Sequence, residues 1–417
     1  MDLSRRPENQ ESDGYHTALL AGAPFFDLLR GRDTADLSIC AGLSGLALFA
    51  AHASNIHPSY RTTALHTLDT LLRGLSLNNP SSGLHEGAAG VAWTLAHLQR
   101  EGFIANPIDL SGIDRLCAAL AEEADAVGSY DLVRGLVGYG VYFLERLPAS
   151  RAATGLLSVV DSLTRTAVST RHGIAWLNSP SSLAKIQVDR GPNDWYDLGL
   201  AHGLAGVVGL LAAILRVGIG ESRTRPLLLQ AAHSLGHLAI ETGSKGGTPP
   251  YISAEPGRQI PKAVHAWCYG DPGVGVALMM ASDVLHDTNL AELGLTLVRR
   301  SARRLNSDEH PLDPWFCHGT SGLAHIFSRV SRRTGDKIIA AAAAHYGAIT
   351  LGNWYGLTVN RVASADGPTC SRDSGLGLLD GISGVGLTLL SLAGEPSARW
   401  DRVLLTGYLD DITISTG

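Results

Sequence analysis

Apolar residues gather in short runs that are hydrophobic on nearly every side, for example at 46–53, 207–215 and 274–285. Runs of this length and character predict buried helices. Each run follows a G-x-x-G element, which repeats at intervals suited to one helix pair plus variable loops. The element occurs at 42–45, 87–90, 135–138, 203–206, 270–273, 319–322 and 381–384.

The segments between these runs are amphipathic, with one charged face, as at 61–75, 225–241 and 290–305. They suit an outer layer of helices whose second face meets solvent. No alternating run is strong enough for a large sheet, so the predicted class is all-α. The stretch from about 166 to 197 is the exception, because its pattern also fits short strands in a small insertion. We expect one domain over 1–417, with seven helix-pair repeats between about 16 and 395.

Seven stacked helix pairs form either an open solenoid or a closed ring, and periodicity alone does not choose between them. In both arrangements the inner helices begin at the glycine turns and point their N-termini toward the same end. Free backbone N–H groups and positive dipole ends collect there, where they stabilise thiolates or a developing enolate. We therefore expect the functional site at that end.

Composition and charge exclude several classes of protein. Glycine is enriched, at 48 of 417 residues, which fits the repeated turns. The 33 basic and 39 acidic residues form no basic stripe, so nucleic acid is not an expected partner. The N-terminus lacks the apolar core of a signal peptide, and Arg216 interrupts the longest apolar stretch before it could span a bilayer. These features indicate a soluble cytoplasmic protein whose five cysteines are free thiols or ligands.

Two cysteines occupy the same offset in adjacent repeats. Cys268 and Cys317 each stand two residues before the first glycine of their repeat, and His318 follows Cys317. Residues at matching offsets are expected at similar heights in neighbouring units, so the two sulfurs should lie side by side. Two thiolates and an imidazole suit zinc, and three protein ligands leave the open position that is typical of a catalytic site. We predict one zinc ion per chain at Cys268, Cys317 and His318, where it would activate a thiol.

Acid and base candidates occupy related offsets. His202 stands one residue before Gly203 and is a candidate general acid or base, with a buried or capping histidine as the alternative. Asp131 either orients an imidazole or accepts a proton, and a helix N-cap is an equally good interpretation.

The other polar residues and cysteines near the turns have less specific interpretations. His85, Glu86 and Asp380 are interpreted as lining or capping groups. Cys40 shares the ligand offset but belongs to a distant repeat, so it is not counted among the predicted ligands. Cys117 is expected in the core and Cys370 in a loop.

These residues together resemble the lanthionine synthetase C-like family, the cyclases of lanthipeptide biosynthesis. The resemblance rests on the segments 267–270, 317–319, 200–203 and 130–131, and it runs from the first glycine turn to the last. It implies a closed α/α toroid of seven inner and seven outer helices with zinc at one end. His202 and Asp131 match the family's proposed acid and base positions, and Trp267 would lie beside the metal.

The resemblance also implies an activity and partners. A cysteine thiol of a dehydrated precursor peptide would add to a dehydroalanine or dehydrobutyrine of the same peptide and form a thioether ring. The chain is too short for a fused dehydratase, so the resemblance implies a stand-alone cyclase. It would work beside a separate dehydratase and an export transporter, in the cytoplasm or at the periphery of a membrane-associated complex.

The candidate substrate-binding residues are Trp267, Tyr269 and His265. Some members of the family carry an arginine shortly before the tryptophan, whereas residues 261–266 contain none. The role of that arginine is therefore not transferred to this chain.

Three other functions remain open. A related enzyme would add glutathione or another small thiol to dehydrated residues. A prenyltransferase-like toroid also uses zinc to activate a thiol, but with a different order of ligands. A non-catalytic scaffold would bind a peptide or a dehydratase without chemistry.

Overall fold

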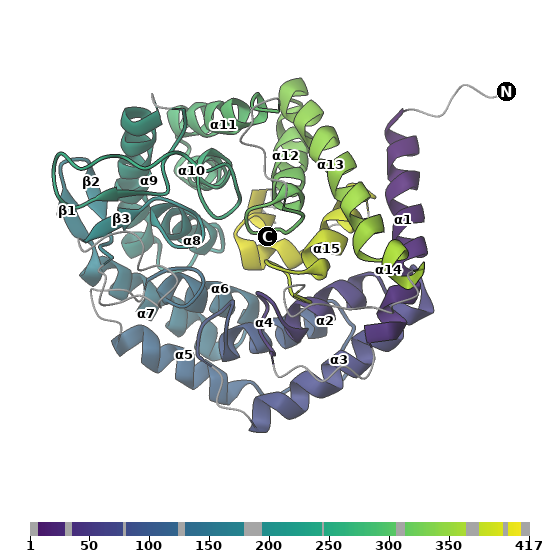
Figure 1. Cartoon of the computed structure of the whole chain (residues 1–417). Helices are drawn as coiled ribbons and strands as arrows, with labels where there is room; N and C mark the ends of the chain where they lie inside the picture. The colour runs from purple at the N-terminus through teal and green to yellow at the C-terminus, as the bar shows by residue number, and fades with distance from the viewer. Residues whose placement is uncertain are drawn as a thin grey trace.

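Two concentric layers of helices surround a common centre (Figure 1). The computed structural model describes residues 7–29, 36–77, 81–123, 130–178, 194–243, 246–305, 313–363, 375–394 and 399–409. The inner layer consists of α2 (Leu43–His52), α4 (Ala88–Arg100), α6 (Leu136–Arg146), α8 (Leu204–Arg216), α10 (Asp271–Leu285), α12 (Thr320–Thr334) and α15 (Ile382–Leu392). The outer layer consists of α1 (Pro7–Leu29), α3 (Pro58–Leu77), α5 (Ser111–Glu123), α7 (Ser150–Thr166), α9 (Glu221–Gly243), α11 (Thr288–Ala302) and α13 (Lys337–Leu357).

The layers close into an α/α toroid, which confirms the predicted fold. Each inner helix contacts the next, and the last, α15, packs against the first, α2. Helix α1 precedes the first glycine turn in sequence and packs against α3, α13 and α15, so it completes the outer layer where the first and last repeats meet. The short helix α14 (Val359–Ala363) follows α13 and also contacts α1.

Burial in each layer follows the sequence pattern. Every residue of α8 is buried except Arg216 at its end. Outer helix α7 buries a stripe that includes Ala152, Leu156, Val159 and Leu163, at spacings of three and four residues. Among the described residues no helix is both long and apolar enough to cross a membrane.

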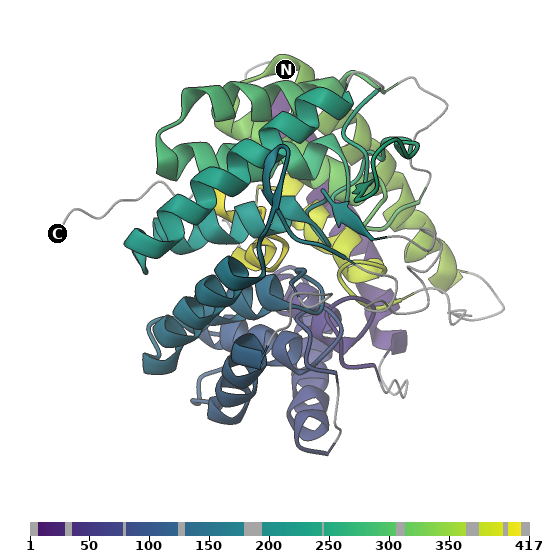
Figure 2. The same cartoon turned by 90° about the vertical axis from the view of Figure 1, so that its left-hand side faces the viewer.

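The predicted strand-containing insertion lies on the outside of the toroid, on the face toward the viewer in Figure 2. Strands β1 (Val168–Thr170) and β2 (Gly173–Ala175) form a hairpin. Strand β3 (Trp195–Asp197) pairs with β4 (Tyr251–Ser253), which comes from the interval after α9. The prediction of strands within 166–197 is therefore confirmed, whereas the sequence pattern does not predict the pairing with β4.

Backbone hydrogen bonds join the seven segments before the inner helices into a closed circle, which we call the mouth ring. In each unit one residue shortly before the first glycine donates its N–H to a carbonyl of the next unit, at N···O distances of 2.9–3.3 Å. The donors in ring order are Cys40, His85, Leu132, Ala201, Cys268, Cys317 and Leu379, and Leu379 donates back to the carbonyl of Cys40. The circle fixes the relative height of residues that are hundreds of positions apart in sequence.

Residues 399–409, which we call the central plug, fill the middle of the toroid (Figure 1). They form the 3-10 helices η3 (Arg399–Leu404) and η4 (Gly407–Leu409), which contact α6, α10 and α12. The fully buried carboxylate of Asp401 accepts a hydrogen bond from Arg329 Nε at 2.8 Å and lies 2.9 Å from His325 Nε2. Trp267 Nε1 donates to the carbonyl of Leu404 at 3.1 Å. The plug thus contacts the segment that carries Trp267 and the predicted metal ligand Cys268.

Gly270 has a backbone conformation that an L side chain rarely adopts, with φ 90° and ψ −168°. A Cβ atom there would lie 1.6 Å from the carbonyl oxygen of Val264. Gly270→Ala should therefore lower the free energy of unfolding by at least about 1–3 kcal/mol. The measurement is urea denaturation. Gly112→Ala is the control, because a Cβ there meets nothing within 4 Å and should stabilise by about 0.4–1 kcal/mol. Equal unfolding midpoints for wild type and Gly270→Ala would contradict this geometry.

Candidate functional site

Most of the candidate catalytic and metal-binding side chains stand on the mouth ring. The residues one position before the first glycine of each unit are Ala41, Glu86, Arg134, His202, Tyr269, His318 and Asp380. The cysteines of interest stand one position earlier. Ionisable groups from distant parts of the sequence therefore converge at the end of the toroid where the inner helices begin.

Cys268 and Cys317 are brought together as the matched offsets predict. The Cys268 N–H donates to the Cys317 carbonyl at 3.3 Å, and the two side chains are hydrogen-bonded to each other. The hydrogen bond from Cys317 lowers the pKa of Cys268, and together with the charge of His202 it outweighs burial, which acts in the opposite direction. The same contact and burial raise the pKa of Cys317 well above its usual range. The contact therefore favours ionisation of Cys268 over that of Cys317.

His318 lies next to this pair, with half of its side chain exposed. A ring nitrogen of His318, the Cys317 sulfur and a carboxylate oxygen of Asp380 all lie within 4.8 Å of one another. The His318 Nε2 atom is also 3.2 Å from Asp313 Oδ2. A carboxylate beside one ring nitrogen is the arrangement that commonly orients a metal-binding histidine. Sequence reasoning missed Asp313, although it stands close before His318.

Asp380 and Cys40 lie closer to the cysteine pair than the sequence suggests. The Cys40 thiol donates to Asp380 Oδ2 at 3.4 Å, and Leu379 N–H donates to the Cys40 carbonyl at 3.0 Å. The expectation that Cys40 belongs to a distant repeat is wrong, because ring closure makes the first and seventh units neighbours. Burial and the charge of Asp380 raise the pKa of Cys40 far above its usual range, so this thiol is a hydrogen-bond donor.

His202 and Asp131 form a close pair, with His202 Nδ1 2.7 Å from Asp131 Oδ2. The other carboxylate oxygen, Oδ1, accepts from the N–H groups of Arg134 at 2.7 Å and Gly135 at 3.2 Å. Asp131 therefore contacts the imidazole with one oxygen and holds the turn before α6 with the other. It is not the N-cap of that helix, because Gly135 occupies that position and α6 has no side-chain cap. With Nδ1 held by the carboxylate, His202 Nε2 is the nitrogen available for proton transfer.

The charge of each partner controls the other's protonation. Burial alone would lower the pKa of His202, but the charge and hydrogen bond of Asp131 outweigh burial and raise it. Burial likewise opposes ionisation of Asp131, but the charge of His202 lowers the pKa of that carboxyl. The pair therefore favours an imidazolium and a carboxylate.

The insertion supports this pair. Asn178 Nδ2 donates to the hydroxyl of Tyr130 at 2.8 Å and to Asp197 Oδ2 at 2.9 Å. Tyr130 directly precedes Asp131, and Asp197 ends strand β3 shortly before His202. A single buried amide thus connects the two loops that carry the acid–base pair.

The three candidate substrate-binding residues lie in different environments. Tyr269 is half-buried, and its ring stacks on His202 with centroids 6.1 Å apart. Trp267 is fully buried and packs edge-on against Phe316, so in this structure it supports the site from below. His265 lies with Nδ1 3.3 Å from Ser301 Oγ of outer helix α11. Substrate contact stays a prediction for all three, and the structure favours Tyr269 most.

The remaining candidates have supporting positions. His85 is fully buried beside Trp267, and burial lowers its pKa to about 4. Glu86 accepts hydrogen bonds from Arg134 at 2.5 and 2.7 Å. Cys117 is buried in the core, as expected, and Cys370 lies outside the described residues.

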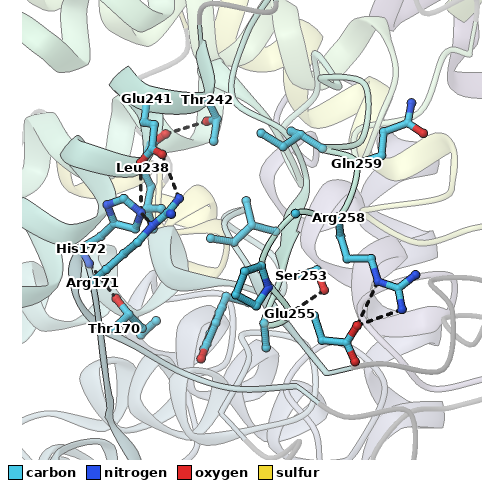
Figure 3. Close-up of a pocket in the computed structure, with 17 residues that line it drawn as sticks. Thr170, Arg171, His172, Leu238, Glu241, Thr242, Ser253, Glu255, Arg258 and Gln259 are labelled. Atoms are coloured by element: carbon cyan, nitrogen blue, oxygen red, sulfur yellow. Dashed lines mark hydrogen bonds and ion pairs between the residues drawn. The ribbon is translucent and has the colours of Figure 1, made fainter.

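A pocket of about 440 Å³ opens on the insertion, between the β1–β2 hairpin, α9 and the segment after β4 (Figure 3). Glu241 on its wall lies 2.9 Å from Arg171 and 3.0 Å from His172, and Arg258 pairs with Glu255. None of the residues that line it belongs to the mouth ring. Its described charged groups pair with one another, and none of the candidate site residues lines it.

The residues at the mouth ring fit a divalent metal ion. The Cys317 sulfur, a His318 ring nitrogen and an Asp380 oxygen form one group, and the Cys268 side chain adjoins Cys317. Asp380 Oδ1 is buried with no hydrogen-bond partner in the described part of the chain. A soft set of sulfur and nitrogen donors with an added carboxylate is characteristic of zinc. The group of mutually close donors contains the predicted ligands Cys317 and His318 together with Asp380, whereas Cys268 adjoins it through Cys317. The ligand set Cys268, Cys317 and His318 stays a prediction.

Comparison with known proteins agrees with this fold. A family model described as lanthionine synthetase C-like protein matches residues 33–405. The nisin biosynthesis protein NisC of Lactococcus lactis subsp. lactis is 22% identical over 377 residues, which cover 86% of this chain and 85% of that protein. A solved structure of a nisin cyclase superposes with a TM-score of 0.72 at 20% identity, over 93% of this chain and 96% of that one. Because the family match spans most of its length, the chain belongs to the lanthionine synthetase C-like family.

Proposed function

We propose that this protein is a zinc-dependent lanthipeptide cyclase. It would join cysteine thiols to dehydroalanine or dehydrobutyrine residues within a dehydrated precursor peptide that a separate dehydratase supplies. The observation that carries the proposal is the convergence of a cysteine pair and a histidine–aspartate pair on one ring of backbone hydrogen bonds. Its proposed location is the cytoplasm, where a reducing environment keeps both substrate and ligand thiols free.

Cys268, Cys317 and His318 would hold one zinc ion in this proposal. When bound, the ion supplies stabilisation of a substrate thiolate at neutral pH, where a free cysteine with a pKa near 8.5 is mostly protonated. Tyr269, stacked on His202, would form the wall between this position and the acid–base pair.

His202 would supply the proton that completes the reaction. A carbon–sulfur bond forms at the β-carbon, the carbon–carbon π bond breaks, and the α-carbon gains one proton in place of the one that the thiol lost. Asp131 holds His202 Nδ1, so Nε2 would be the donor. The charge of Asp131 would also favour the protonated imidazole.

The test of the function is incubation of the purified zinc-loaded protein with a dehydrated peptide that contains one cysteine. Ring formation does not change the mass of the peptide, but it leaves no free thiol to alkylate. After treatment with an alkylating reagent, mass spectrometry therefore distinguishes the cyclised peptide, which gains no mass, from the linear one, which does. A parallel reaction with glutathione and a cysteine-free dehydrated peptide tests the alternative, because intermolecular addition raises the mass by one glutathione. Addition of glutathione without any ring closure would reject the cyclase in favour of the alternative.

Substitution of the ligands and of the acid should have separable effects. Cys268→Ala and Cys317→Ala are expected to lose both bound zinc and cyclisation, because each removes a thiolate. His202→Asn should keep its zinc and lower kcat by about 10²–10⁴-fold, the usual contribution of a general acid. Elemental analysis of each protein and single-turnover alkylation assays measure the two effects. Full activity in a metal-free Cys317→Ala protein is the result that refutes the mechanism.

Activity should depend on the protonation of His202. As a proton donor it acts in its protonated form, so kcat/KM should fall as pH rises through a His202 pKa above 6.5. Asp131→Asn removes the charge that raises this pKa, and burial then lowers it, so the alkaline limb should move to lower pH. The surface variant Asp69→Asn is the control and should leave the profile unchanged. An unshifted limb in Asp131→Asn would show that another group donates the proton.

A further inference from the structure

The carboxylate of Asp380 lies between two neighbouring units of the mouth ring. Cys317 N–H donates to the Leu379 carbonyl at 3.0 Å, so His318 and Asp380 follow the same hydrogen-bonded pair at the same offset. An Asp380 oxygen lies within 4.8 Å of both the Cys317 sulfur and a His318 ring nitrogen. The side chain is therefore within reach of an ion that these two residues bind.

The two oxygens of Asp380 are used unequally. Oδ2 accepts the hydrogen bond from the Cys40 thiol at 3.4 Å, which fixes the orientation of the carboxylate. Oδ1 is buried and has no hydrogen-bond partner among the described residues. A buried carboxylate oxygen without a donor is unfavourable unless a cation satisfies it.

No cationic side chain does so in the described part of the chain. Arg134 stands on the same ring, but Glu86 engages it through both oxygens. Asp313 takes the outer side of His318, 3.2 Å from Nε2, and does not meet Asp380 in any described contact. Oδ1 is therefore not engaged by any described cationic side chain and is available to a metal ion.

We propose that Asp380 is a fourth protein ligand of the divalent metal at this site, beside the two cysteines and the histidine. The assignment rests on the proposed function, because it concerns the same ion. Zinc accepts carboxylate oxygen together with sulfur and nitrogen in four-coordinate sites. Cys40 is the residue that orients this ligand, and the Cys40 thiol is not itself a ligand.

The assignment changes how a substrate thiol gains access. A thiolate is a softer and stronger ligand for zinc than a carboxylate, so it can take the place of Oδ1, while the thiol proton leaves to solvent. Asp380 would therefore close the metal site in the absence of peptide and compete with every thiol that enters. This competition predicts two opposite effects. Loss of the Asp380 carboxylate should weaken the binding of the metal to the protein but strengthen the binding of a thiol to the metal.

The experiment uses the full-length protein loaded with zinc or with Co²⁺, whose visible spectrum reports its ligands. Two affinities are measured, that for zinc by competition with a chromophoric chelator and that of the Co²⁺ protein for 2-mercaptoethanol by its sulfur-to-cobalt charge-transfer band. Asp380→Asn should raise the zinc Kd by about 10–100-fold, comparable to losing a group that supports the site. The Kd for 2-mercaptoethanol should fall several-fold in the same variant.

Matched variants distinguish a metal ligand from a residue that only lies near the metal site. Asp313→Asn removes the carboxylate on the other side of His318, and it should weaken zinc binding without tightening thiol binding. Cys40→Ser keeps a donor to Asp380, so both affinities and the intensity of the wild-type charge-transfer band should be retained. Asp380→Ser repeats the main measurement should the asparagine variant fail to fold.

The outcomes distinguish this inference from the proposed function. Thiol affinity that is unchanged or weaker in both Asp380 variants would overturn the assignment of Asp380 as a ligand, while leaving the zinc cyclase intact. A wild-type protein that binds neither zinc nor Co²⁺ would overturn both. A weaker charge-transfer band in Cys40→Ser would identify Cys40 as a ligand and contradict the role of its thiol as a hydrogen-bond donor that only orients Asp380.

Discussion

The mouth ring is the constraint on which the site depends. Each of its seven hydrogen bonds joins backbone groups from two different units, so a side chain at one offset is held at a defined height relative to the same offset next door. The cysteine pair, His318 with Asp380, and the loops of His202 and Asp131 are all consequences of this register. This register is held without disulfide bonds among the described residues. The hydrogen bonds close a circle, so no unit of the ring has an unpaired edge.

The sequence predicted most of the fold, because repetition carries information that single segments do not. A buried apolar run after each glycine turn indicates the inner layer. The matched offsets of Cys268 and Cys317 in adjacent repeats are enough to predict that their sulfurs lie close together. The pairing of His202 with Asp131 was one of two open interpretations, since an aspartate before a helix is as often a cap. In the structure one oxygen of Asp131 contacts His202 and the other holds the turn before α6, whose N-cap is Gly135.

Other features depend on contacts that no local pattern encodes. Cys40 and Asp380 meet only because the toroid closes. The repeat pattern does not predict this contact, because it fits an open solenoid equally well. Strand β4 is three residues long, too short to show a period, and it pairs with a strand from another interval. The central plug has no glycine turn and no repeat. Its place is decided by buried partners such as His325 and Arg329, which stand on an inner helix far away in sequence.

The central plug also bears on how a long peptide can be handled. Buried side chains of residues 399–409 contact α6, α10 and α12 in the middle of the toroid, so the described part of the chain closes its centre. A flexible polymer would therefore not pass through the centre from one face to the other. Each successive crosslink in one polymer would instead require a new segment of it to approach the mouth ring from outside.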